Sequence, residues 1–188
     1  MMALPCSGTC TRLLAVLLLG AACVSFPVRT APPARSTPAR AAPPPTSAEL
    51  AAVARAVLQR ANAVRAEMKV AALREAPPLN VAAQDYAYEL ATRQRLDHNS
   101  PKPGRETMTQ RIEAAGGTWQ RAAENLASTS DIMVDVPRIV IELWLTSAGH
   151  RRNLLDPAYT TTGVGVARDA RGFWYVVQLY VFPPPPRR

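Results

Sequence analysis

The amino-acid sequence predicts an α+β fold, because patterns typical of helices and of strands occupy separate blocks. Between residues 46 and 155, apolar residues recur mostly at spacings of three and four, as in helices that bury one face. From residue 162 to 182 the pattern changes to short runs of β-branched and aromatic residues. No internal repeat is visible. These blocks predict one domain over residues 46–182, with about four helices and about three strands.

The first predicted helix opens this domain. Thr46 and Glu49 match a capping box, in which two side chains bind free backbone N–H groups at a helix start. The apolar positions that follow lie on one helical face until about Met68: Leu50, Val53, Val57, Leu58, Ala61 and Val64. This pattern predicts a long helix that packs against a core along one side.

The second predicted helix runs from Asn80 to Leu96. Pro77 and Pro78 precede it and are interpreted as the break between the two helices. His98 lies just past the predicted helix end, within Asp-His-Asn-Ser-Pro, a composition typical of a loop. The chain contains only two histidines, so His98 is a candidate for chemistry.

A short third helix is predicted from Thr107 to Ala115, where two glycines follow. The next segment is mixed and favours a strand around Trp119. Glu124 and Asn125 lie side by side at the predicted end of this strand. The carboxylate is a candidate metal ligand, and the amide either orients a ligand or holds a loop through hydrogen bonds.

The fourth predicted helix precedes the second histidine. Asp131 or Asp135 is its expected N-cap. Its apolar positions are Ile139, Val140, Leu143 and Trp144. Trp144 is expected to be buried between this helix and the sheet. Gly149 is the expected helix stop, and His150 follows it directly.

The last part of the predicted domain is rich in strand-forming residues. Two such runs extend from Thr162 to Val166 and from Phe173 to Phe182. The segment Asp-Ala-Arg-Gly at residues 169–172 lies between them and is typical of a turn, so the two runs predict a β-hairpin. Residues 183–188 form a Pro/Arg tail, in which regular structure ends.

Residues 1–22 are typical of a secretory signal peptide. The apolar run from Leu13 to Phe26 has 14 residues, fewer than the roughly 20 that cross a bilayer. Small residues precede Cys23, as a cleavage site requires. Plain secretion, lipidation of Cys23 and an uncleaved anchor all stay open. Each places the domain outside the cytoplasm, as a secreted, periplasmic or cell-surface protein, and no transmembrane helix is expected in the mature form.

The flanks also carry most of the charge and all of the cysteines. Residues 23–45 are rich in Pro, Ala and Arg, and predict a semi-rigid linker. The formal net charge is +8, but residues 46–182 hold 16 Lys and Arg against 14 Asp and Glu. Nucleic acid is therefore not an expected partner, whereas the basic flanks suit an acidic cell-envelope surface. The three cysteines all lie within the first 23 residues, which excludes a disulfide framework in the domain.

Five segments, in the same order, resemble the motifs of bacterial CAP domains, the family of cysteine-rich secretory proteins, antigen 5 and pathogenesis-related 1 proteins. The segments are Asn62 with Arg65, Asp97-His98, Ala123 to Leu126, Trp144 to Asn153, and Gly163 to Gly165. The resemblance covers roughly residues 58 to 181. The chain departs from the family pattern at three positions: Ala123 replaces a glycine, Ala148 replaces a proline, and Ser147 stands where many eukaryotic members carry a second acid.

The resemblance implies a three-layer α-β-α sandwich around a small antiparallel sheet. It also implies a cleft in which His98, His150 and Glu124 can hold a divalent, zinc-like ion, since imidazole and carboxylate are its usual ligands. Asn125 and Ser147 are expected at the same cleft, although Ser147 cannot replace the charge of the missing acid. From the residues alone, the alternative is that both histidines are buried hydrogen-bonding groups.

Three classes of function stay open. The first is a non-catalytic extracellular binding module, whose cleft takes a lipid, a peptide or a glycan, with or without metal. The second is a metal-assisted hydrolase, in which Glu124 is a ligand or general base. The third is a structural protein of the cell envelope. The binding module is the expected function, because the sequence lacks a His-Glu-x-x-His motif and a clear second carboxylate.

Two further pairs of residues have open roles. Arg151 and Arg152 either meet an anionic ligand or lie in a solvated helical turn that extends to Leu155. Ser100 and Ser147 each lie close to a histidine in the sequence, but neither lies in a nucleophile-elbow pattern. A serine hydrolase is therefore not expected.

Overall fold

The structure is a computed structural model that describes residues 44–185. The expected signal peptide and nearly all of the expected linker lie outside these residues. The helices are α1 Ser47–Glu67, α2 Pro77–Arg93, α3 Met108–Ala114, α4 Val136–Thr146 and α5 Ala148–Leu155. The strands are β1 Arg74–Glu75, β2 Arg121–Thr129, β3 Thr161–Arg168 and β4 Trp174–Phe182. No helix within residues 44–185 is both long enough and apolar enough to cross a membrane.

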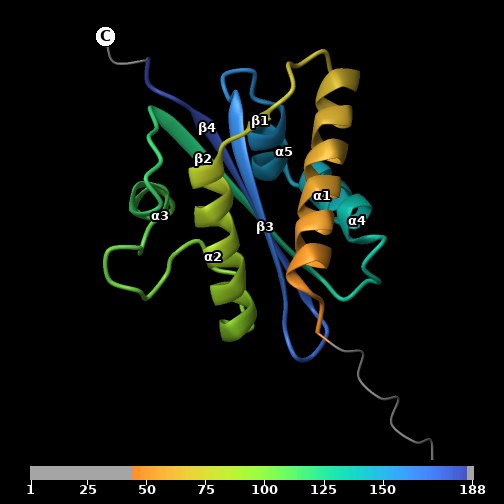
Figure 1. The fold of residues 1–188 in the computed structure, drawn as a ribbon. Coiled ribbons are helices and arrows are strands. Elements are labelled where there is room, and N and C mark those ends of the chain that lie inside the picture. The colour runs from red at the N-terminus through yellow and green to blue at the C-terminus, as the bar shows by residue number, and fades with distance from the viewer. Residues whose placement is uncertain (1–43, 186–188) are drawn as a thin grey trace, which may run out of the picture. The chain divides into compact units, whose positions relative to one another are not determined.

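The strands form one sheet in the order β1-β3-β4-β2, with a helical layer on each face (Figure 1). β2, β4 and β3 pair antiparallel, whereas β1 adds a two-residue parallel pairing to β3. The predicted α+β class and the α-β-α sandwich are therefore confirmed. The structure adds a fifth helix and makes the sheet mixed, because the short β1 enters the sheet beside the start of β3.

Strand alternation divides the interior into two cores, since neighbouring side chains of a strand point to opposite faces. On β4, Val176 and Tyr180 face the core under α1, α4 and α5, whereas Val177 and Leu179 face the core under α2 and α3. Trp144 is completely buried in the first core, as expected from its position on the fourth helix. The two faces of β2 alternate in the same way, and this alternation positions the candidate site.

The first and third helices begin where the sequence predicts. Thr46 and Glu49 form the capping box of α1, and Thr107 with Gln110 forms another at the start of α3. The prediction for α2 was wrong by three residues at its start and its end. Its first turn contains Pro77 and Pro78. Proline has no backbone N–H group, and in the first turn of a helix that group has no intrahelical partner to lose. These prolines therefore begin the helix that they were expected to delay.

Two further boundaries differ from the predictions. Gly149 was expected to stop the fourth helix, but α4 ends at Thr146 and Gly149 is the second residue of α5. Ser147 has an extended backbone and forms the corner between these helices. Glu124 and Asn125 were expected at the end of a strand, but they lie in the middle of β2, because pairing with β4 extends that strand to Thr129.

The outer edge of β3 lies against α2 at very short distance. A Cβ atom on Gly163 would lie 2.1 Å from the backbone carbon of Leu79, and one on Gly165 would lie 2.2 Å from that of Ala83. Only glycine allows this approach without displacing the helix. The close contact brings polar side chains of α2 within reach of the strand backbone.

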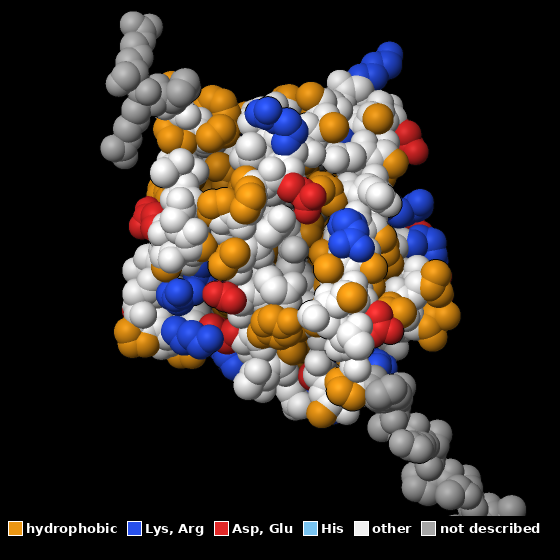
Figure 2. All heavy atoms as spheres, in the orientation of Figure 1, with side chains coloured by type: hydrophobic (Ala, Val, Ile, Leu, Met, Phe, Trp, Pro, Cys, Tyr) orange, Lys and Arg blue, Asp and Glu red, His pale blue; other side chains and the backbone are white. Residues whose placement is uncertain are grey.

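Two amide side chains of α2 bind the backbone of β3. The N–H groups of Val164 and Val166 donate to Asn80 Oδ1 and Gln84 Oε1, both at 3.2 Å. Gln84 Nε2 donates to the carbonyl oxygen of Val166 at 2.8 Å. Figure 2 shows the surface that carries α1 and α2, where basic and acidic side chains are interspersed and no basic stripe forms.

Candidate functional site

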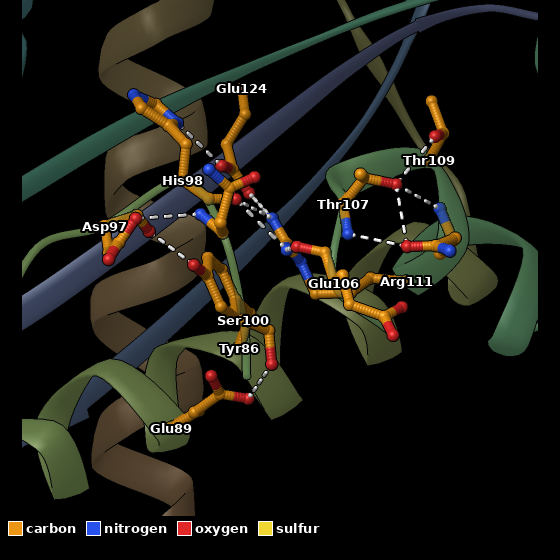
Figure 3. A network of polar contacts seen from close by, with 12 residues as sticks. Tyr86, Glu89, Asp97, His98, Ser100, Glu106, Thr107, Thr109, Arg111 and Glu124 are labelled. Atoms are coloured by element: carbon orange, nitrogen blue, oxygen red, sulfur yellow. Dashed lines mark hydrogen bonds and ion pairs between the residues drawn. The ribbon is translucent and has the colours of Figure 1, made fainter. Parts of the chain in front are cut away.

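Glu124 is the centre of a buried polar network on the face of β2 that α2 and α3 cover (Figure 3). Its Oε1 atom lies 2.9 Å from Nδ1 of His98. Its Oε2 atom accepts a hydrogen bond from Arg111 at 2.7 Å. The side chains of Glu124 and Arg111 are only 3% and 4% exposed, so this ion pair is shielded from water. Both carboxylate oxygens are therefore engaged within the protein.

Arg111 holds the loop that carries His98. It donates to the carbonyl oxygen of His98 at 3.2 Å and to that of Glu106 at 3.3 Å. Its guanidinium carbon lies 3.5 Å from the centre of the Tyr86 ring, a cation–π contact. The Tyr86 hydroxyl donates to the carbonyl oxygen of Asp97, and burial raises its pKa to about 12, so it stays a neutral donor. Arg111 thus joins α2, α3, β2 and the loop.

Other polar contacts fix the same loop to α2. Ser100 Oγ donates to Glu89 Oε2 at 2.9 Å, and Arg93 pairs with Glu89 at 3.2 Å. Arg93 also pairs with Asp97 at 3.3 Å. Ser100 has a structural partner in Glu89, so its hydroxyl is used to anchor the loop. The position of His98 is consequently determined by buried neighbours, although its own side chain is 60% exposed.

Asn125 faces the opposite side of β2 and fastens α5 to the sheet. Its Nδ2 atom donates to the backbone carbonyl of His150 at 3.0 Å and to the Tyr180 hydroxyl at 3.1 Å. Its Oδ1 atom accepts from Asn153 at 3.0 Å. Of the two roles considered for Asn125, the structure shows the holding role, because its amide is occupied on both sides by the protein.

His150 begins the inner face of α5 and is half-buried. Among the described residues its ring makes no hydrogen bond. Burial lowers the pKa of His150, and the nearby His98 lowers it further. β2 is the last strand of the sheet, and Glu124 and Asn125, which bind the His98 ring and the His150 backbone, lie on its two opposite faces. Ser147, at the helix corner, accepts a backbone hydrogen bond from Arg151, and its hydroxyl has no partner among the described residues.

The donor atoms that the described residues offer a divalent ion are two imidazole nitrogens. Within residues 44–185, no group of three or more His, Cys, Asp and Glu side chains is placed to hold a metal. Glu124 is engaged by Arg111 and by His98 Nδ1, which leaves Nε2 of His98 and the ring of His150 as free nitrogen donors. A carboxylate that orients a histidine ligand through its second nitrogen is a common outer partner of metal sites. Glu124 suits that role, and the three-ligand set stays a prediction.

Sequence reasoning missed Arg111 and Tyr86, although both contact the site. The sequence carries no local signal for Arg111, which the structure buries beside Ile112 in α3. An arginine so placed needs an acceptor, and the sequence does not say which one. Tyr86 lies on the buried face of α2, and its role depends on the distant Arg111.

The three-layer fold is that of solved SCP-domain proteins. An outer surface protein from Borrelia burgdorferi has this fold, with a TM-score of 0.61 and 19% identity over 71% of this chain and 94% of its own. An extracellular SCP-domain protein from Bacillus anthracis gives 0.60 and 22% identity over 74% of this chain and 45% of its own. These likenesses show the fold.

The family follows from a direct match. The model of CAP, the cysteine-rich secretory protein family, matches residues 58–180, and the chain belongs to this family. YkwD of Bacillus subtilis is 28% identical over 109 residues, which are 58% of this chain and 40% of that protein. YlbC, a membrane protein of the same organism, is 34% identical over 112 residues, which are 60% of this chain and 31% of that protein. The chain thus spans less than half of these relatives.

The surroundings of the two histidines shift their pKa values in opposite directions. The hydrogen bond to Glu124 raises the pKa of His98 above its ordinary value of 6.5, whereas burial lowers that of His150. The contact of protonated His98 with Glu124 therefore contributes its full stability below pH 6.5. This contribution is lost as the pH rises through the pKa that His98 has in the folded state. The neutral His150 contributes above pH 6.5, and its contribution is lost as the pH falls through its folded value.

Replacing Glu124 by glutamine is expected to lower the pKa of His98, because the variant removes the main cause of its rise while Arg111 remains. Titration of both imidazoles by NMR measures the shift. Asp85→Asn is the control, since this exposed carboxylate pairs with Arg105 and should leave His98 unchanged. The His98–Glu124 contact would be contradicted by an unchanged His98 pKa in a Glu124→Gln protein whose amide spectrum is still well dispersed.

Proposed function

We propose that this protein is an exported, non-catalytic binding module whose ligand site is formed by His98 and His150 at the edge of β2. The observation that carries the proposal is the Glu124 carboxylate, held between Arg111 at 2.7 Å and His98 at 2.9 Å. This contact fixes the His98 ring with Nδ1 turned inward. The other nitrogen, Nε2, is left for a ligand on the exposed side of the imidazole.

The site is proposed to hold a divalent, zinc-like ion through the two imidazoles. Such an ion supplies a positive charge that can bind a carbonyl, carboxylate or phosphate group of a ligand. Glu124 would orient His98, and Asn125 would hold α5 so that His150 stays beside it. One structural relative, NaASP2, was solved with Zn²⁺, at a TM-score of 0.51 and 12% identity over 72% of this chain and 82% of that one. That likeness supports the fold of the proposed site.

A binding function is favoured over hydrolysis because Glu124 is already engaged. A general base must reach a water molecule or a substrate proton with a free oxygen atom. Both oxygens of Glu124 have partners, and the Arg111 side chain is buried against one of them. Within residues 44–185, no carboxylate forms with both histidines a group that could hold a metal. In this proposal Glu124 orients His98, and the two histidines bind the ligand without catalysing a reaction.

The proposed location is outside the cytoplasm, at or beyond the cell envelope. The expected signal peptide and linker support export, and lipidation of Cys23 is one form that attachment can take. The structural relatives described as an outer surface protein and an extracellular protein also support it. In that setting the proposed ligands are a lipid, a peptide or a glycan of the envelope or its surroundings.

Zinc titration of the full chain by calorimetry tests the metal. His98→Ala and His150→Ala are each expected to weaken zinc binding by tenfold or more, because each removes one of two protein ligands. Glu124→Gln is expected to weaken it by about 10–100-fold, the usual cost of losing an outer partner. Asp85→Asn is the matched control at an exposed carboxylate. Full affinity in both histidine variants, or no zinc binding in the unchanged protein, would refute the metal site and leave a module that binds without metal.

A further inference from the structure

A second candidate site lies on the outer face of α5, away from the histidines. A surface groove of about 540 Å³ runs along this face. It is lined by Ala148, Arg151, Arg152, Leu155, Asp156 and Pro157. Arg151 and Arg152 lie between His150 and Asn153 in the sequence. His150 and Asn153 serve the candidate site, but the proposed function gives the two arginines no role.

Helical geometry separates the groove from the histidine site. Residues of a helix advance by about 100° each, so Ala148, Arg151, Arg152 and Leu155 share one face of α5. His150, Asn153 and Leu154 lie on the opposite face, where Asn153 binds Asn125 and Leu154 is fully buried. α5 thus has an inner face that holds the sheet and an outer face whose Ala148, Arg151 and Arg152 are exposed in the part of the chain that the structure describes.

The charges facing the groove are unbalanced. Arg151 and Arg152 are exposed, and neither forms an ion pair with any residue in the described part of the chain. Asp156, the one acidic residue of the lining, is already paired with Arg121 at 2.8 Å. The groove therefore keeps two positive charges beside the apolar surface of Leu155 and Pro157.

We propose that this groove binds a phosphate group of a larger ligand, with the two guanidinium groups holding its oxygens. A guanidinium is planar and binds two oxygen atoms at once. One carboxylate has two oxygens and satisfies one such group, whereas a tetrahedral phosphate offers an oxygen pair to each of two arginines. The apolar residues of the groove suit the uncharged remainder of the ligand. The groove is independent of the histidine site, and its test does not depend on zinc.

The test uses the full chain with two probes: inorganic phosphate, and vesicles of phosphatidic acid, whose headgroup is a phosphate monoester, in phosphatidylcholine. Phosphate is expected to shift the amide NMR signals of residues 148–157. The double variant Arg151→Gln with Arg152→Gln is expected to weaken phosphate binding by about tenfold or more, because it removes the charge-assisted hydrogen bonds of both guanidinium groups. Higher salt should weaken it as well, since both partners are charged at the surface.

The double variant Arg60→Gln with Arg138→Gln changes the net charge equally and serves as the control, because both residues are exposed and lie outside the groove. The proposal is supported if the Arg151 and Arg152 double variant binds either probe more weakly than the control does. If only vesicle binding depends on these arginines, the phosphate group belongs to a lipid headgroup. Equal weakening in the two double variants would refute the proposal. So would phosphate shifts that fall outside residues 148–157, or no binding of either probe.

Discussion

Replacing Arg65 by methionine is expected to destabilise the domain by about 3–5 kcal/mol, because four carbonyl groups would lose the charged donor that binds them. Arg65 is fully buried on α1. It donates to the carbonyl oxygens of Ala71 and Leu154, each at 2.8 Å. It also reaches those of Tyr159 at 3.1 Å and Asp156 at 3.2 Å. Methionine has a similar length but no donor, so the buried contacts to the carbonyl groups of Leu154 and Tyr159 would be left unsatisfied.

Urea unfolding followed by circular dichroism measures this loss. Arg60→Met is the matched control on the same helix, since Arg60 is exposed and its replacement should change stability by less than about 0.5 kcal/mol. Arg65→Lys should recover only part of the loss, because one ammonium group cannot reach carbonyls on several segments. A methionine variant as stable as the control would show that water replaces the arginine and that the contacts contribute little.

Replacing Trp144 by alanine is also expected to cost about 3–5 kcal/mol, the range for large aromatic side chains in cores. Trp144 is completely buried, and its Nε1 atom donates to the carbonyl oxygen of Leu126 at 3.0 Å. Alanine would leave a cavity between α4 and the sheet and remove a hydrogen bond from the edge of β2. Denaturant unfolding gives the value, and a loss below about 1 kcal/mol would contradict the packing.

Trp144→Phe separates the two contributions in that site. Phenylalanine retains most of the apolar contact but has no N–H group, so it should cost clearly less than alanine, with about 1 kcal/mol of the loss due to the hydrogen bond. Leu143→Ala is the control on the same helix, because Leu143 is 45% exposed and should change stability only slightly. Equal losses for phenylalanine and alanine would show that the hydrogen bond dominates the site.

Much of the fold was predictable because it depends on local chemistry. The capping box at Thr46 and the hairpin between β3 and β4 follow from residues that lie close together in the sequence. The start of α2 at Pro77 was missed because proline both ends helices and favours their first turn. The helix corner at Ser147 was missed because it depends on contacts of α5 with the sheet, such as the one with Asn125, which no local pattern encodes.

The candidate site shows the same limit. The likeness to CAP motifs selected His98 and Glu124, and the structure places these side chains in contact at 2.9 Å. The sequence did not indicate that Glu124 has a buried guanidinium on its other oxygen, since Arg111 lies on a different helix and its role depends on the fold. Glu124 was expected to be a metal ligand, but one of its oxygens binds Arg111, which only the packing of distant segments brings to it.

The amide contacts of Asn80 and Gln84 also affect how copies of this domain behave toward one another. An open strand edge is a template on which a second chain can add and begin aggregation. On β3, Val166 has both backbone groups bound by Gln84, and the N–H group of Val164 is bound by Asn80. An incoming strand would have to break these bonds before it formed its own. Two side chains one helical turn apart therefore favour the monomer over edge-to-edge stacking, even where the domain is concentrated at a surface.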